Sequence, residues 1–148
     1  MAQQVKDVMT PAVATVRPDA SVVEAAQLMR AQDIGDVFVA RDGELLGVLT
    51  DRDITLRAVA DGVDPLTVNC QAVCTADPVT VGPDTDTTQA VTLMRRHAVR
   101  RLPVVDGGRP LGVVSIGDLA QERDPDSALA DISRAAPDNW PGTGSSTI

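Results

Sequence analysis

Hydrophobic residues recur along this chain in two patterns, and each pattern appears twice. Short runs rich in valine and leucine, such as Val37-Phe38-Val39 and Leu102 to Val105, are typical of buried strands. Elsewhere apolar side chains fall three or four positions apart, which places them on one face of a helix. In the first such window these are Val22, Ala25, Ala26 and Met29. The two patterns together predict a mixed α/β protein.

The whole pattern repeats after 65 residues, because residues 13–54 align with 78–119 without a gap. About a third of the aligned pairs are identical, among them Pro18 with Pro83 and Asp53 with Asp118. An ungapped register of this length indicates a duplicated unit.

Each copy begins with an extended segment, residues 14–16 or 79–81, that is followed by a proline. A helix comes next, and its start carries residues at the spacing of a capping box. These are Ser21 with Glu24 in copy one and Asp86 with Gln89 in copy two. In copy two the predicted inner face comprises Thr87, Ala90, Val91 and Leu93 or Met94.

A hairpin and a second helix complete each copy. The hairpins turn at Asp42-Gly43 and at Gly107-Gly108, which are residues that tolerate positive φ. The second helices are predicted from Asp51 to about Ala60 and from Gly117 to about Glu122. Each unit therefore has the order β-α-β-β-α.

The repeats divide the chain into four parts. Residues 1–62 form the first repeat, 63–69 a linker, 70–122 the second repeat, and 123–148 a C-terminal segment. A short helix is predicted between residues 65 and 74, and another through Arg134. Residues 137–148 are rich in Pro, Gly and Ser, which predicts a flexible tail unless Trp140 docks.

Both hairpins leave the sheet through the pattern Gly-x-x-[Ser/Thr]-x-x-Asp, at Gly47 to Asp53 and at Gly112 to Asp118. A Ser or Thr followed three residues later by an acid caps a helix start. An Asp carboxylate can also accept hydrogen bonds from the two hydroxyls of a ribose, and the hydroxyl and helix-start N–H groups can face phosphate. The residues alone leave capping and nucleotide binding both open.

Composition excludes several function classes. A formal charge of −8 and a pI of about 4.4 argue against a nucleic-acid partner. No apolar run approaches the length of a membrane span and the N-terminus lacks an apolar signal core, so we expect a soluble, cytoplasmic protein without a membrane partner. A single histidine, no P-loop and no nucleophile–base motif indicate that the protein is not an enzyme.

Cys70 and Cys74 are the two cysteines of the chain, and with His97 they are too few for a zinc site. On a helix their Cβ atoms would lie roughly 5–6 Å apart, too far for an unstrained disulfide. Two interpretations remain: small buried side chains, or a reversible thiol switch.

The set of motifs resembles a tandem cystathionine-β-synthase (CBS) domain pair, the Bateman module. The resemblance rests on the paired hairpin exits, on Asp7-Val8-Met9-Thr10-Pro11, and on the segment from His97 to Val104, and it covers residues 5–122. It implies a pseudo-twofold module whose sheets face each other, with helices outside and two clefts between. Members of that family bind AMP, ADP, ATP or S-adenosylmethionine in these clefts, without a required cofactor.

The resemblance also implies roles for individual positions. Asp118 and Asp53 would hold ribose, and Ser115 and Thr50 would hold phosphate or ribose. Segments flanking the adenine would contain Thr15, Val16, Thr80 and Val81. The other walls would contain Gly35, Asp36, Val37, Arg101, Leu102 and Pro103. The family further implies a homodimer, and the sequence as a whole predicts a free-standing module that signals to an effector protein.

The two copies differ where a phosphate would bind. Copy two has Arg100 and Arg101 where copy one has Gly35 and Asp36, and Arg52 aligns with Gly117. We therefore expect cations from Arg52, Arg100 and Arg101, and the better cleft around Asp118. The dense cluster of Arg95, Arg96, His97, Arg100 and Arg101 is either a solvated helix end or part of such a site. The alternatives to a nucleotide sensor are a ligand-free structural or protein-interaction dimer and the thiol switch.

Overall fold

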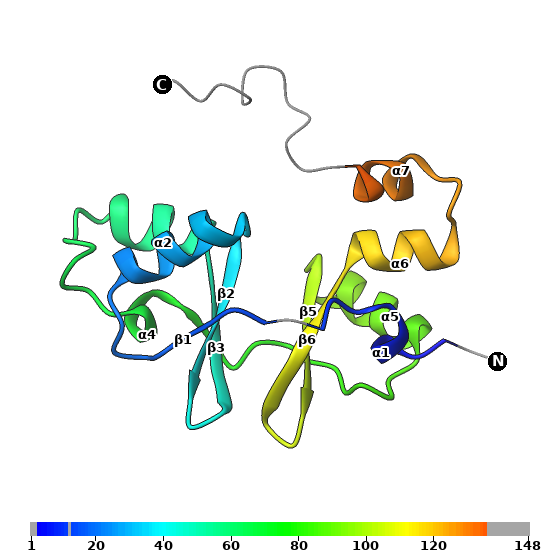
Figure 1. The fold of residues 1–148 in the computed structure, drawn as a ribbon, viewed down its shortest axis with the longest axis horizontal. Coiled ribbons are helices and arrows are strands. Elements are labelled where there is room, and N and C mark those ends of the chain that lie inside the picture. Colours follow the sequence, from blue (N-terminus) through cyan, green and yellow to red (C-terminus); the bar gives the residue numbers. More distant parts are fainter. Residues whose placement is uncertain (1–2, 12, 136–148) are drawn as a thin grey trace.

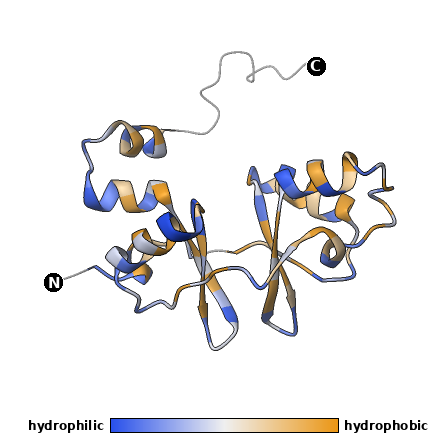
Figure 2. Ribbon diagram, turned by 180° about the vertical axis from the view of Figure 1, so that it is seen from behind, coloured by the Kyte–Doolittle hydropathy of each residue, from blue (hydrophilic) through white to orange (hydrophobic). Residues whose placement is uncertain are grey.

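Two antiparallel hairpins stand side by side at the centre of the molecule, with helices on their outer sides (Figure 1). This is a computed structural model, and it describes residues 3–11 and 13–135. The predicted mixed α/β architecture of two β-α-β-β-α units is confirmed. The hydropathy colouring shows apolar strands and amphipathic helices (Figure 2), as expected for helices packed on one side of a thin sheet.

The first unit follows the predicted order. Its elements are β1 (Thr15–Val16), α2 (Val22–Gln32), β2 (Asp36–Arg41), β3 (Glu44–Thr50), α3 (Asp51–Ile54) and the π-helix η1 (Thr55–Val59). The predicted second helix thus changes to π geometry after its first turn. The sheet has the order β1-β2-β3-β4, where β4 (Thr75–Ala76) comes from the beginning of the second repeat.

The second unit repeats this arrangement with α5 (Thr87–His97), β5 (Arg101–Asp106), β6 (Arg109–Ser115) and α6 (Ile116–Arg123). Its first strand is reduced to one parallel bridge between Val81 and Val104. A short helix precedes this order at the equivalent position of each repeat, α1 (Val5–Val8) and α4 (Cys70–Val73), and α7 (Ala128–Arg134) follows the second repeat. The helices predicted in the connection and before Arg134 are both present.

The helix starts differ in detail from their sequence pattern. The Ser21 hydroxyl accepts a hydrogen bond from the Glu24 N–H, as predicted. The Asp86 carboxylate instead accepts from the N–H of Thr88, so the expected pairing with Gln89 is wrong. Both acceptors satisfy a free N–H of the first turn, which is what the cap requires. Ala26 was also expected inside but is exposed, because the buried face of α2 consists of Val22, Ala25 and Met29.

Each core is completed by a short helix from a distant part of the sequence. Val5 of α1 is fully buried in the second core, although it belongs to the first repeat (Figure 1). Cys70 and Val73 of α4 are buried in the first core. The segment after each short helix then pairs with the last hairpin strand, Thr10 with Val113 and Thr75 with Val48. The two units are therefore interlocked.

This crossing explains the glycine of each hairpin exit. A Cβ at Gly47 would lie 2.7 Å from both the Sγ of Cys74 and the carbonyl oxygen of Thr75. A Cβ at Gly112 would collide with the carbonyl oxygen of Thr10 and lie 3.1 Å from the Sδ of Met9. The strand approaches another backbone so closely that there is no space for a side chain, which requires glycine.

The hairpin tips of the two units also meet. The N–H of Leu45 donates to the carbonyl of Gly108 at 2.9 Å. The symmetric bond would run from position 110 to Gly43, but residue 110 is a proline and has no N–H. The pseudo-twofold relation is thus broken at the tips by one residue.

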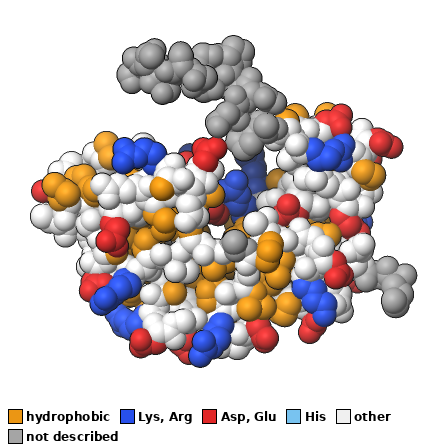
Figure 3. All heavy atoms as spheres, viewed as in Figure 1, with side chains coloured by type: hydrophobic (Ala, Val, Ile, Leu, Met, Phe, Trp, Pro, Cys, Tyr) orange, Lys and Arg blue, Asp and Glu red, His pale blue; other side chains and the backbone are white. Residues whose placement is uncertain are grey.

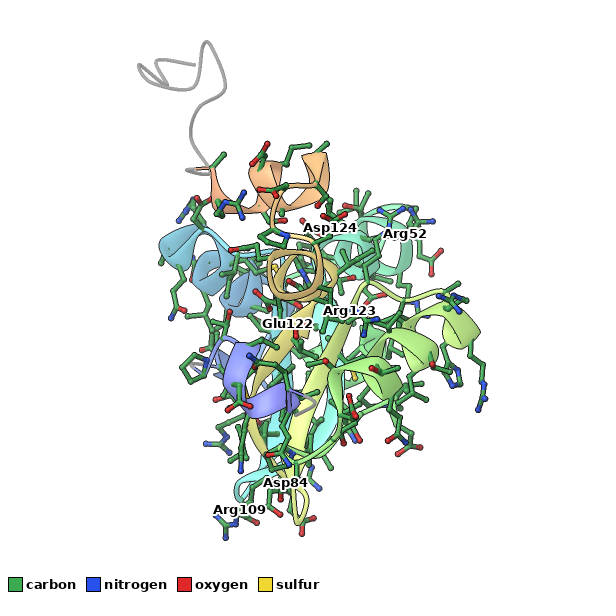
Figure 4. All side chains as sticks on the ribbon, turned by 90° about the vertical axis from the view of Figure 1, so that its right-hand side faces the viewer. Arg52, Asp84, Arg109, Glu122, Arg123 and Asp124 are labelled. Carbon is green, nitrogen blue, oxygen red and sulfur yellow. The ribbon has the colours of Figure 1, made fainter. Side chains whose placement is uncertain are left out.

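The C-terminal helix α7 lies on α6 in two perpendicular views (Figures 1 and 4). The Ser127 hydroxyl caps it by accepting from the N–H of Ala130 at 3.1 Å, and Ala130 is fully buried. The predicted flexible tail, with Trp140, falls outside the described residues. Among the described helices, none has the length and apolar character needed to cross a bilayer.

Candidate functional site

A cleft of about 1220 Å³ lies between the two units, and both hairpin exits contribute to it. Thr50 and Arg52 line it from the first unit, and Ser115 and Asp118 from the second. Its size falls just above the range typical of small-molecule sites.

Both hairpin exits form reciprocal capping boxes. In the second unit the Oδ2 of Asp118 accepts from the N–H of Ser115 at 2.9 Å, and the Ser115 hydroxyl accepts from the N–H of Asp118 at 3.1 Å. Thr50 and Asp53 make the same two bonds at 3.0 Å. Capping therefore accounts for the Ser or Thr and for one carboxylate oxygen of each Asp. Only the other carboxylate oxygen is left to accept a hydrogen bond from a ligand.

That second oxygen has different surroundings in the two units. The Oδ1 of Asp53 lies 3.8 Å from the Nε of Arg57, whose guanidinium also donates to the carbonyl of Cys74 at 3.2 Å. The position equivalent to Arg57 is Glu122 in the second unit (Figure 4). Among the described residues the Oδ1 of Asp118 has no hydrogen-bond partner. Neither Oδ1 accepts a hydrogen bond from the described residues. The Oδ1 of Asp53 forms a long ion pair with Arg57, whereas Asp118 has no ion pair with them and lines the cleft.

Glu122 itself leaves a buried carboxylate oxygen without a partner within the described part of the chain. A buried oxygen of this kind costs free energy unless something compensates. The second unit has an acid with a buried oxygen where the first unit has Arg57. The asymmetry between the units thus extends beyond the arginines noticed in the sequence.

The equivalent positions Asp36 and Arg101 face each other across the pseudo-twofold axis. The Nη1 of Arg101 lies 3.5 Å from the Oδ2 of Asp36. A residue near such an axis lies opposite the equivalent residue of the other repeat. Two aspartates at these positions would repel each other, whereas an aspartate and an arginine attract. The charge of Asp36 is therefore compensated by Arg101.

The positive charge that remains in the cleft comes from Arg52 and Arg100. Neither forms an ion pair with a carboxylate of residues 3–11 and 13–135. In the space-filling view, Lys and Arg side chains are visible in the hollow between the two halves (Figure 3). The predicted basic cluster divides, because His97, Arg100 and Arg101 line the cleft and Arg95 and Arg96 do not.

More than half of the predicted binding residues line the cleft. They are Asp118, Ser115, Arg100, Arg101, Pro103, Thr50, Arg52, Gly35 and Asp36. Four apolar candidates are instead buried in the cores: Val16, Val37, Val81 and Leu102. Thr15, Thr80 and Asp53 also lie outside the lining. The repeat alignment predicts which strands lie near the cleft. Which side chains of those strands face it depends on strand pairing.

Several lining residues were not singled out from the sequence. Val79 and Asp77 lie next to the predicted segment of the second repeat, so a shift of one to three residues would have included them. Val48 and Val113 lie on the hairpin strands within the recognised motif. Leu129 and Ser133 of α7 had no signal, because they are outside the repeat.

The two cysteines are buried and carry free thiols. Burial raises the pKa of the Cys70 thiol to about 11, and the charge of Glu24 adds to the effect. Burial and the charge of Asp53 also raise the pKa of Cys74. Protonated buried thiols react slowly, so the structure favours a packing role over a thiol switch. Among the described residues there is no group of three or more His, Cys, Asp or Glu side chains placed to hold a metal ion.

The free energy of unfolding is expected to fall as the pH rises from about 9 to about 11. The unfolded chain releases the Cys70 proton near its ordinary pKa of 9.0, whereas the folded protein holds it until about 11. The stabilisation is therefore complete below pH 9 and is lost through pH 11. Urea titrations across this range would measure it, with Cys70→Ala as the control. An identical pH profile in that variant would contradict the prediction.

Known proteins are similar to this chain in both sequence and fold. The sequence model described as "CBS domain" matches residues 5–59 and again residues 70–124. The chain belongs to the CBS domain family. The CBS domain-containing protein YhcV of Bacillus subtilis is 42% identical over 133 residues, covering 87% of this chain and 94% of that protein. Hypoxic response protein 1 of Mycobacterium tuberculosis is 32% identical over 131 residues, covering 88% and 91%.

Solved CBS structures share the fold. The crystal structure of Hypoxic Response Protein I with two coordinated zinc ions superposes with a TM-score of 0.74 at 32% identity, covering 80% of this chain and 98% of that one. The CBS domain pair of protein MJ0100, in complex with 5′-methylthioadenosine and S-adenosyl-L-methionine, gives a TM-score of 0.73 at 23% identity, covering 82% and 96%. This CBS pair therefore has the architecture that its sequence motifs imply.

Proposed function

We propose that this CBS pair is a non-catalytic, cytoplasmic regulatory module that binds an adenosyl nucleotide in the cleft around Asp118. The observation that carries the proposal is the free Oδ1 of Asp118 at the wall of a large cleft. A carboxylate in this position can accept hydrogen bonds from the two ribose hydroxyls. Ser115 and the arginines Arg52 and Arg100 would then face the phosphate end or another charged group of the ligand.

The ligand class is supported by the fold. A CBS pair of the same architecture holds methylthioadenosine and S-adenosylmethionine in the MJ0100 complex. The candidate ligands are accordingly AMP, ADP, ATP and S-adenosylmethionine. Asp53 lies outside the cleft lining and within 3.8 Å of the guanidinium of Arg57, so the first-unit side would be weak or empty.

Signalling requires a partner and a change that the partner can detect. Binding between the units would shift the populations of two arrangements of the hairpins, which meet through few contacts at their tips. Exposed apolar side chains on and after η1, Leu56, Val59, Val63 and Leu66, support a homodimer or an effector contact on that side. A ligand-free interaction dimer is the rival function.

Isothermal titration calorimetry of the full-length chain with AMP, ADP, ATP and S-adenosylmethionine tests the proposal. We expect one of the four to bind with a measurable heat and a stoichiometry of one per chain. Arg52→Gln should weaken a phosphate-bearing ligand about fivefold, since one hydrogen bond to a charged group is lost. The matched control is Arg17→Gln, which lies at an exposed pair with Asp19. No heat with any of the four ligands would favour the interaction dimer.

A further inference from the structure

The short helix α7 lies beyond the two stretches that match the CBS family, yet it reaches the cleft. Leu129 and Ser133, one helical turn apart, are both lining residues. Ala130, on the neighbouring side of the helix, is fully buried, and α7 crosses over α6 in contact with it (Figures 1 and 4). The cleft therefore has one wall that the duplicated unit does not supply.

The contact between Gly117 and Ser133 determines how closely α7 approaches. A Cβ at Gly117 would collide with the hydroxyl of Ser133 and lie 2.9 Å from its Cβ. Glycine is costly inside a helix, so its presence in the first turn of α6 requires a packing reason, and α7 provides one. The equivalent position in the first unit is Arg52, whose long side chain itself lines the cleft.

Helix α7 is held in this place at both ends. The Ser127 hydroxyl caps its first turn. At its other end Arg134 donates to the carbonyl of Pro125 and to the carboxylate of Asp131, both at 2.7 Å. A hydrogen-bonded helix with one buried side can hold a cleft residue in a defined position.

We propose that α7 is part of the ligand site, with Ser133 as a further binding residue. This inference rests on the proposed nucleotide function. Gly117 lies between Ser115 and Asp118, so Ser133 is adjacent to the ribose and phosphate end of the ligand. The Ser133 hydroxyl forms no hydrogen bond within the described residues and is available to an oxygen of the ligand. Leu129 supplies an apolar surface beside it.

Calorimetry on full-length variants tests this placement, with the nucleotide that the wild-type chain binds best. Ser133→Phe should weaken binding at least about tenfold, because the ring fills the space next to Gly117. Ser133→Ala should weaken it about threefold to fivefold through one lost hydrogen bond. The matched control is Ile132→Phe, at a neighbouring position that is 71% exposed and outside the cleft. It should bind like the wild type, and circular dichroism checks the fold of all three.

The outcomes separate this inference from the proposed function. If both Ser133 variants bind like the wild type while Asp118→Ala loses affinity, α7 is not part of the site and the nucleotide function stands. Equal losses in Ser133→Phe and Ile132→Phe would also overturn the inference, because the effect would not depend on the side of the helix. If the wild-type chain binds none of the nucleotides, the proposed function fails and this inference fails with it.

Discussion

Asp118→Ala is expected to lower the affinity for the nucleotide about thirtyfold, whereas Asp53→Ala is expected to leave it nearly unchanged. The reason is the second carboxylate oxygen. In Asp118 it is free beside the cleft, and in Asp53 it lies 3.8 Å from the guanidinium of Arg57. Loss of two hydrogen bonds to a charged acceptor costs about 2 kcal/mol or more. Calorimetric titration of both variants with the best ligand would measure the difference.

The two substitutions are matched controls for folding. Each removes the carboxylate hydrogen bond of its capping box and keeps the bond to the Ser or Thr hydroxyl, so each should lower the free energy of unfolding by about 1 kcal/mol. A difference in affinity at similar stability would therefore report on the ligand and not on the helix start. Equal affinities in the two variants would contradict a role for Asp118, and a larger loss in Asp53→Ala would move the site to the first unit.

Gly112→Ala is expected to destabilise the fold by about 3 kcal/mol. A Cβ at this position collides with the carbonyl oxygen of Thr10 and lies 3.2 Å from the Cα of Pro11. These are backbone atoms of the segment that completes the second sheet, so they cannot move aside as a side chain could. The clash would push α1, with the buried Val5, out of the second core. Urea unfolding followed by circular dichroism would measure the change.

Gly82→Ala provides the comparison for this prediction. A Cβ at Gly82 has its nearest neighbour at 3.7 Å, the hydroxyl of Thr85, which is an ordinary contact. The loss of backbone freedom in the unfolded chain is the same for both substitutions. The stability of Gly82→Ala should therefore stay within about 0.5 kcal/mol of the wild type. Similar stability in the two variants would show that the strand crossing at Gly112 adapts at little cost.

These expectations assign separate tasks to the residues of the hairpin exit. The glycine admits a crossing segment, and the Ser or Thr and one oxygen of the Asp cap the following helix. Both tasks are structural and are performed in both copies. The remaining oxygen of Asp118, together with Arg52 and Arg100, is what distinguishes a binding cleft from a well-capped helix.

The divergence of the copies has a geometric basis. Asp36 and Arg101 meet because they occupy equivalent positions near the pseudo-twofold axis, where opposite charges are favoured over identical ones. Arg57 and Glu122 are also equivalent, and their exchange removes the cation that holds Asp53 and leaves Asp118 free. The two copies of the duplicated scaffold thus present their hairpin-exit aspartates in different surroundings.

The sequence by itself determined the duplicated unit, its element order and its family, because hydrophobic periodicity, turn residues and caps are local signals that recur at a fixed offset. It also predicted that the hairpin exits cap helices and that Arg52, Arg100 and Asp118 lie at the cleft between the repeats. Only the tertiary structure decided which side chains face the cleft, since Val37 and Leu102 share strands with residues that line it, and pairing sets the side. It likewise decided that α1 completes the second core and that α7 reaches the cleft through Gly117. Those contacts join segments far apart in the chain, and no local pattern encodes them.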